Sequence, residues 1–351
     1  MLTSGPLGWM ALGIAVLVAL MVGGGWLFAR LYCTPRRRPP DSAPADHGLP
    51  SVPVQFHSRG VPLRGWYVPA ECGSTPHPAV VVAHGWSSNA SHMLPVARRL
   101  HAAGFGVLLY DARGHGMSGG DGPITIRKFA EDLLAAVDYL QSLPAVDPAR
   151  LGVVGHSIGG GGAILAASIE PRIRAVASIS AFADPRTLTR DFMGVLRVPR
   201  GPLLWLVCRF IERWLGTTMS DVSPQNRVGR IGAPLLLAHG TSDRFVPVSN
   251  LEALFARADR SRTWSWPVPG RRHWDVVLDP DLGGRLAGFF GTHLLDGAPE
   301  HRADAPVDAT GTADVAARPP VATADRDAKS QCEEERCTRS GKISNTAPAG
   351  C

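Results

Sequence analysis

The stretch LGVVGHSIGGGGAILAA, residues 151–167, decides how the chain is interpreted. Its first residues, 151–154, are typical of a strand buried on both faces. Residues 155–159 form a Gly-x-Ser-x-Gly turn, and a helix of small residues follows directly. Such a turn is so tight that only residues without side chains fit two positions before and after the serine. The order predicts that Ser157 presents its hydroxyl at the end of a buried strand, facing the positive end of a helix dipole.

A second Gly-x-Ser-x-Gly pattern lies at residues 116–120, centred on Ser118. It follows a polar loop, residues 111–115, and it precedes the tripeptide Asp-Gly-Pro. A helix is not expected to begin at this tripeptide, because Gly and Pro disfavour helix formation. Because only the first pattern stands between a strand and a helix, we predict that Ser157, and not Ser118, is a nucleophile.

Strand-like and helix-like segments alternate along the chain. The predicted strands are Val52–His57, Val61–Val68, Ala79–Ala83, Gly106–Tyr110, Leu151–Gly155, Ala175–Ile179, Pro234–Ala238 and Thr263–Val268. The predicted helices are His92–Ala103, Ile126–Leu143, Ile158–Ile169 and Ser249–Ala258. Strands that alternate with helices of this length predict an α/β fold with a mostly parallel central sheet flanked by helices.

The alternation is interrupted once, over residues 182–230, where we predict a small helical cap. Its apolar stretch Pro202–Gly216 is expected to be a helix that packs on the sheet, or alternatively contacts lipid or roofs the substrate. Residues 33–50 are predicted to be an extended linker, residues 51–296 the folded domain, and residues 297–351 a disordered tail with few large apolar side chains.

A serine hydroxyl needs a base, and that base needs an acid that holds it in the right tautomer. When a serine lies in such a strand-turn-helix arrangement, the acid comes after the serine in the sequence and the histidine comes after the acid. Both lie at the ends of later strands. Asp243 lies in the loop after the strand that begins at Pro234, and His273 lies in the loop after the next strand. We therefore predict Ser157, Asp243 and His273 as a catalytic triad.

Other residues compete for these roles. Asp184 follows the preceding strand and is the rival acid. His239 and His293 are rival bases, but His239 precedes Asp243 and is expected to shape its loop, and His293 falls in a C-terminal helical stretch. Asp275 is expected to be a local hydrogen-bond partner.

A tetrahedral oxyanion requires two preorganised N–H donors. The backbone of Ile158, next to the serine, is predicted to supply one. The loop His84–Asn89 after the third strand is predicted to supply the other from Trp86, because Gly85 lets the backbone turn inward.

The N-terminal segment predicts a membrane helix. Residues 1–29 carry no charged side chain, and the run Leu7–Ala29 is long enough to cross a bilayer. A cleaved signal peptide is the alternative, but the positive start and small-residue exit that it requires are missing. We predict a single transmembrane helix over residues 7–32.

The arginines near this span predict its orientation. They all follow it, at Arg30, Arg36, Arg37 and Arg38. The positive-inside rule therefore places the catalytic domain on the cytoplasmic side of the membrane.

Composition excludes several classes. The net charge is +6 and the pI is near 9.3, so the chain is basic. The sequence nevertheless lacks a dense patch of Lys and Arg interleaved with aromatic residues, and we therefore do not expect nucleic-acid binding. The six cysteines have neither paired zinc-site spacing nor the spacing of a disulfide framework. We expect no metal and no cofactor, and the sequence does not indicate an oligomeric state.

Together these motifs resemble the α/β-hydrolase superfamily. The resemblance covers about residues 51–295 and rests on the motifs His84-Gly85-Trp86, Tyr110–Ser118, Gly155–Gly159, and His239–Pro247 with His273. They are similar to those of the serine aminopeptidase and monoacylglycerol-lipase-like branch. The resemblance implies hydrolysis of carboxylic esters, thioesters or small amides through an acyl-enzyme, and a structural role for the stretch from Asp111 to Ser118.

Three functions follow as hypotheses. The first is an esterase or lipase that acts on small lipophilic acyl esters, with membrane lipid as a partner. The second is a peptidase or amidase that uses the same groups and differs only in its pocket. The third is a non-catalytic binding protein on the same fold, which the ordered triad disfavours.

Overall fold

The computed structural model describes residues 6–71, 76–197 and 201–295 of the 351-residue chain. They contain a sheet of eight strands in the order β1-β2-β4-β3-β5-β6-β7-β8. Pairs β1–β2 and β2–β4 are antiparallel, and all other neighbours are parallel. The strands are β1 Val52–Ser58, β2 Val61–Val68, β3 His77–Ala83, β4 Gly106–Tyr110, β5 Val146–His156, β6 Ile173–Ile179, β7 Leu235–Gly240 and β8 Thr263–Val268. The predicted mostly parallel sheet is confirmed.

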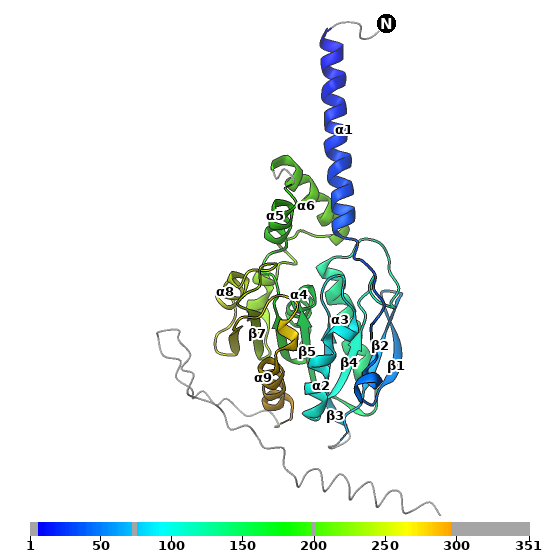
Figure 1. Cartoon of the computed structure of the whole chain (residues 1–351), viewed down its shortest axis with the longest axis vertical. Helices are drawn as coiled ribbons and strands as arrows, with labels where there is room; N and C mark the ends of the chain where they lie inside the picture. Colours follow the sequence, from blue (N-terminus) through cyan, green and yellow to red (C-terminus); the bar gives the residue numbers. More distant parts are fainter. Residues whose placement is uncertain (1–5, 72–75, 198–200, 296–351) are drawn as a thin grey trace, which may run out of the picture. The chain divides into compact units, whose positions relative to one another are not determined.

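Helices cover both faces of this sheet (Figure 1). One apolar cluster joins the sheet to α3, α4 and α8, and another joins its opposite face to α2 and α9. These helices are α2 Leu94–Ala102, α3 Ile126–Gln141, α4 Ile158–Ala167, α8 Ser249–Phe255 and α9 Pro280–Phe290. The predicted α/β layering is therefore confirmed.

Strand β5 lies near the middle of the sheet, between β3 and β6. Its neighbouring residues Val153 and Val154 are both fully buried, and they belong to opposite apolar clusters. Each such side chain contributes roughly 1.5–3 kcal/mol through burial. The uninterrupted apolar run in the sequence thus reflects a strand with no solvent-facing side at this point.

The cap contains α5 Pro185–Val195, α6 Gly201–Leu215 and α7 Pro224–Arg227. Helix α6 was predicted, but α5 was not. Asp184 precedes α5, and its Oδ1 accepts a hydrogen bond of 2.8 Å from the backbone N–H of Thr187, as an N-cap does. In the sequence, an N-cap residue followed by proline, here Asp184 and Pro185, is a recognisable signal for the start of a helix, and it could have predicted α5.

Helix α1, Pro6–Tyr32, is followed by a segment that packs on the domain. The backbone N–H of Arg36 donates to Ser87 Oγ at 3.0 Å, and Asn89 Nδ2 donates to the carbonyl oxygen of Pro39 at 3.1 Å. A short 3-10 helix follows at Pro44–His47. Residues 33–50, expected to be an extended linker, are thus held against the loop after β3. The predicted tail, residues 297–351, lies outside the described residues.

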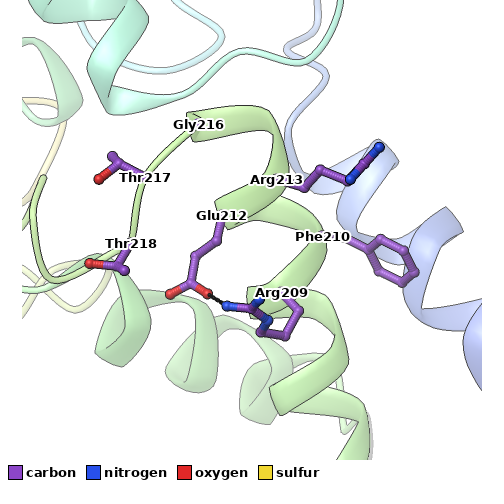
Figure 2. Close-up of a pocket in the computed structure, with 7 residues that line it drawn as sticks. All are labelled: Arg209, Phe210, Glu212, Arg213, Gly216, Thr217 and Thr218. Carbon is purple, nitrogen blue, oxygen red and sulfur yellow. Dashed lines mark hydrogen bonds and ion pairs between the residues drawn. The ribbon is translucent and has the colours of Figure 1, made fainter.

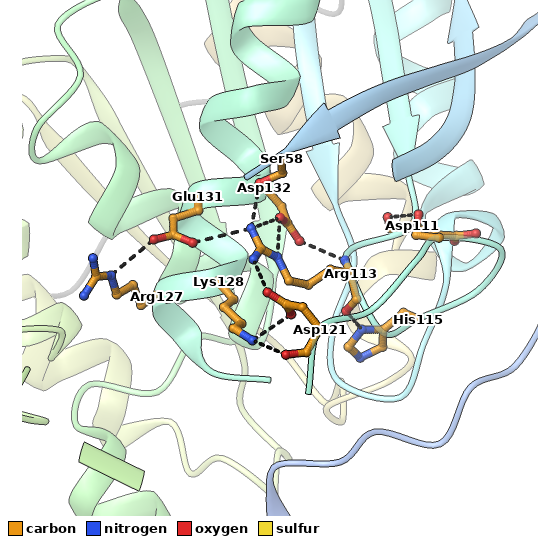
Figure 3. A network of polar contacts seen from close by, with 10 residues as sticks. Ser58, Asp111, Arg113, His115, Asp121, Arg127, Lys128, Glu131 and Asp132 are labelled. Atoms are coloured by element: carbon orange, nitrogen blue, oxygen red, sulfur yellow. Dashed lines mark hydrogen bonds and ion pairs between the residues drawn. The ribbon is translucent and has the colours of Figure 1, made fainter. Parts of the chain in front are cut away.

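A buried ion-pair network anchors the polar loop after β4 (Figure 3). Arg113 Nε donates to Asp132 Oδ1 on α3 at 2.7 Å, and both side chains are almost fully buried. Arg113 Nη2 also donates to Ser58 Oγ at 2.7 Å. The guanidinium therefore links the loop to α3 and to the β1–β2 hairpin.

Replacing Asp132 with Ala is expected to lower the free energy of unfolding by about 3 kcal/mol, because it leaves the Arg113 charge buried without its closest carboxylate. The matched change Glu131→Ala, one residue earlier on α3, is expected to cost less than about 1 kcal/mol, because that carboxylate is partly solvated. Denaturant unfolding of the detergent-solubilised chain measures both. Equal losses in the two variants would contradict this account.

Candidate active site

Ser157 occupies the sharp turn between β5 and α4. Its backbone has φ +57° and ψ −122°, a conformation that costs a residue with a side chain about 1–3 kcal/mol. A Cβ on Gly155 would lie 2.2 Å from the carbonyl oxygen of Gly159, and one on Gly159 would lie 2.4 Å from the carbonyl oxygen of His84. The glycines on both sides of Ser157 are therefore required by close backbone contacts, as the Gly-x-Ser-x-Gly pattern predicts.

The three predicted triad residues lie together. His273 Nε2 is 3.0 Å from Ser157 Oγ, and His273 Nδ1 is 2.6 Å from Asp243 Oδ2. All three side chains are buried. They come from the loops after β5, β7 and β8, and these loops meet because parallel strands end at one edge of the sheet.

The environment of Asp243 keeps its carboxylate ionised. Burial alone would raise the pKa, but hydrogen bonds from His239 and His273 outweigh it and hold the pKa of Asp243 below its ordinary value. The backbone N–H groups of Phe245 and Val246 also donate to Oδ1 at 2.9 and 2.8 Å. An ionised acceptor at Nδ1 leaves the Nε2 of His273 free to accept the serine proton.

The loop after β3 lies directly against Ser157. A Cβ on Gly85 would be only 3.3 Å from the Cβ of Ser157. The loop can therefore lie this close to the serine because residue 85 has no side chain. Ser87, two residues later, has φ +51° and turns the backbone. Trp86, predicted as an oxyanion donor, sits between these two residues, and Ile158 is the first residue of α4, where a backbone N–H has no partner within its helix.

The competing residues have other contacts. Ser118 is buried, donates to the carbonyl oxygen of Asp111 and accepts from the backbone N–H of Arg64, which is a structural arrangement. The carboxylate of Asp184 caps α5, and His293 packs against aromatic rings near the edge of the sheet. Asp275 bonds to its neighbour Arg272 rather than to His273.

His239, expected to shape the Asp243 loop, does contact it. Its Nε2 lies 2.7 Å from the carbonyl oxygen of Val246 and 3.4 Å from Asp243 Oδ2.

Two buried histidines, His84 and His156, belong to the motifs quoted above but had no predicted role of their own, and both support the site. His84 accepts from the backbone N–H of Ala112 through Nε2, so its Nδ1 carries the proton that it donates to the carbonyl oxygen of Gly85 at 2.7 Å. His156 Nε2 is 2.8 Å from the carbonyl oxygen of His273 and holds that loop in place. Their positions beside Gly85 and Ser157 in the sequence were the available signal.

A surface hollow of about 580 Å³ lies away from these residues, between α6 and the turn Gly216–Thr218 (Figure 2). Arg209 and Arg213 line it, and Arg209 pairs with Glu212 at 2.8 Å. None of its lining residues belongs to the group around Ser157. Within the described residues, no group of three or more His, Cys, Asp or Glu side chains is placed to hold a metal ion.

A serine in a strand-turn-helix elbow, on a mostly parallel sheet with helices on both faces, defines an α/β hydrolase. The protein family described as serine aminopeptidase, S33, matches residues 74–225. An uncharacterized Mycobacterium tuberculosis protein, Rv2307c, is 31% identical over 282 residues, which cover 79% of this chain and 92% of that protein. The chain belongs to the serine aminopeptidase S33 family of the α/β-hydrolase superfamily.

Other relatives agree with this assignment. The Pyrococcus furiosus esterase Pf2001 aligns with a TM-score of 0.59 and 25% identity, over 74% of this chain and 99% of that one. The thiohydrolase apmlB of Arthrinium phaeospermum is 33% identical over 133 residues, which cover 37% of this chain and 42% of that protein. The comparisons support a hydrolase.

Acidification is expected to destabilise the fold. Burial lowers the pKa of His84 to about 4 and the pKa values of His115 and His156 to about 3, whereas an unfolded histidine titrates near 6.5. Between these values the unfolded chain binds more protons than the native one. Stability is therefore full above about pH 6.5 and falls below it by about 1.4 kcal/mol per pH unit for each of the three histidines.

The measurement is denaturant unfolding of the detergent-solubilised chain at a series of pH values from 7 down to about 4.5. His156→Gln keeps a hydrogen-bond donor but removes one titrating group, so the slope should fall by about 1.4 kcal/mol per pH unit. A stability that stays constant over this range would refute the assignment of neutral buried histidines.

Proposed function

We propose that the chain is a membrane-anchored serine hydrolase that cleaves carboxylic ester or thioester bonds of lipophilic acyl substrates through an acyl-enzyme. The observation that carries the proposal is the continuous hydrogen-bonded series from Asp243 through His273 to Ser157, with heavy-atom distances of 2.6 and 3.0 Å. A buried serine within reach of an imidazole that is itself held by a carboxylate is the arrangement needed to activate a hydroxyl.

In the proposed mechanism, Ser157 Oγ attacks the carbonyl carbon while His273 Nε2 takes the hydroxyl proton. The carbonyl electron pair moves to oxygen, and the backbone N–H groups of Trp86 and Ile158 stabilise the resulting oxyanion. His273 then donates its proton to the leaving alkoxide or thiolate as the bond to the acyl carbon breaks. A water molecule, deprotonated by His273, hydrolyses the acyl-serine and restores the hydroxyl. These steps use only protein groups and water.

Ester or thioester chemistry is proposed because relatives with named activities include an esterase and a thiohydrolase. The family description, serine aminopeptidase, supports the alternative that the substrate is a small peptide or amide. The same triad serves both reactions, so the difference lies in the contacts to the leaving group.

Helix α1 is proposed as the membrane anchor. It is long and apolar enough to cross a bilayer, and nearly all of its side chains up to Gly24 are exposed. Large apolar side chains such as Leu12 and Leu17, at 54% and 68% exposure, would face lipid. The arginines that follow α1 support a cytoplasmic catalytic domain, which protease protection in closed vesicles would test.

Replacing Ser157 with Ala is expected to abolish labelling by a fluorophosphonate probe and to reduce hydrolysis of a short p-nitrophenyl ester by at least about 10³-fold, because the nucleophile is lost. Ser118→Ala is the matched control, since Ser118 has the same sequence motif but only structural contacts. Labelling and turnover should persist in that variant. Labelling that survives in the Ser157 variant would exclude this serine as the nucleophile.

A profile of acyl esters, acyl thioesters and aminoacyl amides at matched concentration distinguishes the two substrate classes. We expect kcat/KM for medium-chain esters to exceed that for the corresponding amides by at least about 100-fold, a difference that contacts to the leaving group can produce. A preference for aminoacyl amides would replace the esterase proposal with the peptidase alternative.

A further inference from the structure

Helix α1 starts to pack against the cap before its apolar run ends. Apart from Gly8, residues 7–24 are exposed, and they span roughly 27 Å at 1.5 Å per residue. Gly25 and Ala29 are then buried, and a Cβ on Gly25 would lie 2.8 Å from Leu206 Cδ2 and 3.3 Å from Leu203 Cδ1 of α6. A bilayer has a hydrocarbon core of about 30 Å, so α6 meets α1 where that core would end.

The hairpin formed by α5 and α6 exposes large apolar side chains beside this contact. Val195 and Leu196 at its tip are 81% and 52% exposed, and Trp205 is 62% exposed. Trp205 lies between these two α6 leucines in the sequence, so at 3.6 residues per turn its side chain points away from the contact with α1. Figure 1 shows α5 and α6 beside the C-terminal part of α1, where Tyr32 also packs on Phe192 of α5.

Charged side chains follow further along α6. Arg209 and Arg213 are exposed, and only Glu212 offsets them within the hollow (Figure 2). Along α6, the tryptophan and the apolar residues that contact α1 come first, and the arginines follow. This order is typical of a helix that lies at the boundary between acyl chains and headgroups. Arg197 at the tip is long enough to extend its guanidinium to lipid phosphates.

We propose that the α5–α6 hairpin is a second membrane contact, embedded at the acyl-chain and headgroup boundary of the leaflet next to the catalytic domain. Val195, Leu196 and Trp205 contact lipid, and Arg209 and Arg213 contact lipid phosphates. This inference rests on the proposed anchoring through α1. It also specifies the substrate, because a cap held in the leaflet delivers acyl lipids of that leaflet to Ser157.

The position of the loop after β3 supports this delivery. Only three residues separate the end of α1 at Tyr32 from Arg36, whose backbone N–H donates a hydrogen bond to Ser87 Oγ. The four steps along the backbone from residue 32 to residue 36 span at most about 14 Å. Gly85 of the same loop lies beside Ser157, because a Cβ on Gly85 would be 3.3 Å from the Cβ of Ser157. The serine therefore lies close to the membrane surface from which α1 emerges.

The experiment places a fluorescent label at single cysteines of the full chain in phosphatidylcholine and phosphatidylglycerol vesicles, with Cys33 and Cys208 changed to Ala and the other native cysteines to Ser. The positions are Trp205→Cys on the hairpin, Leu17→Cys on α1, and Trp264→Cys on the edge strand β8 as the control. Lipids with a nitroxide near the glycerol backbone or deep in the acyl chain act as quenchers.

We expect the label at residue 205 to be quenched most by the shallow nitroxide, the label at 17 by the deep one, and the label at 264 by neither. Quenching at 17 with none at 205 would overturn the hairpin contact while keeping the anchor. No quenching at 17 would overturn the anchor and the inference together. These results do not depend on catalytic activity, so they are independent of the proposed chemistry.

A second measurement tests delivery. Trp205→Glu is expected to reduce hydrolysis of a long-chain ester embedded in vesicles by about tenfold, with hydrolysis of a soluble short ester unchanged. Trp264→Glu, the matched control, should change neither rate. Equal rates on the embedded ester for both variants would show that the hairpin does not deliver substrate from lipid.

Discussion

The strained turn at Ser157 is the constraint on which the rest of the site depends. It is possible only because β5 lies deep in the sheet, where burial of its valines on both faces outweighs the backbone strain. The same turn brings the backbone of Gly159 against that of His84, and thereby fixes the loop that carries Trp86. One local conformation thus sets the positions of the serine and of the proposed oxyanion donors.

Electrostatics divide the histidines around this turn into different roles. Burial holds His84, His115 and His156 neutral, so they act as hydrogen-bonding or packing groups. His273 differs because an ionised carboxylate, Asp243, lies 2.6 Å from its Nδ1 and stabilises the imidazolium that forms when it takes a proton. Neutral neighbours add no competing positive charge beside that imidazolium, which favours proton transfer from the serine.

The N-terminal helix, the cap and the loop after β3 form one connected set of contacts. Helix α1 packs on α6 through Gly25, and the segment that follows it bonds to Ser87. A membrane anchor attached through a flexible linker would leave the orientation of the domain free. Here the short, docked connection ties the proposed anchor to the side of the domain that carries Ser157, which is the physical basis for the proposed supply of substrate from the leaflet.

The sequence by itself determined the α/β layering, the elbow at Ser157 and the order of Asp243 and His273, because buried strands and tight glycine turns leave local signatures. Tertiary structure alone decided the rest. The role of His156 depends on a loop 117 residues away in the chain, and the docking of residues 33–50 depends on side chains of another loop. Such contacts have no local pattern, because each residue's partner is set by the packing of distant strands rather than by its neighbours in sequence.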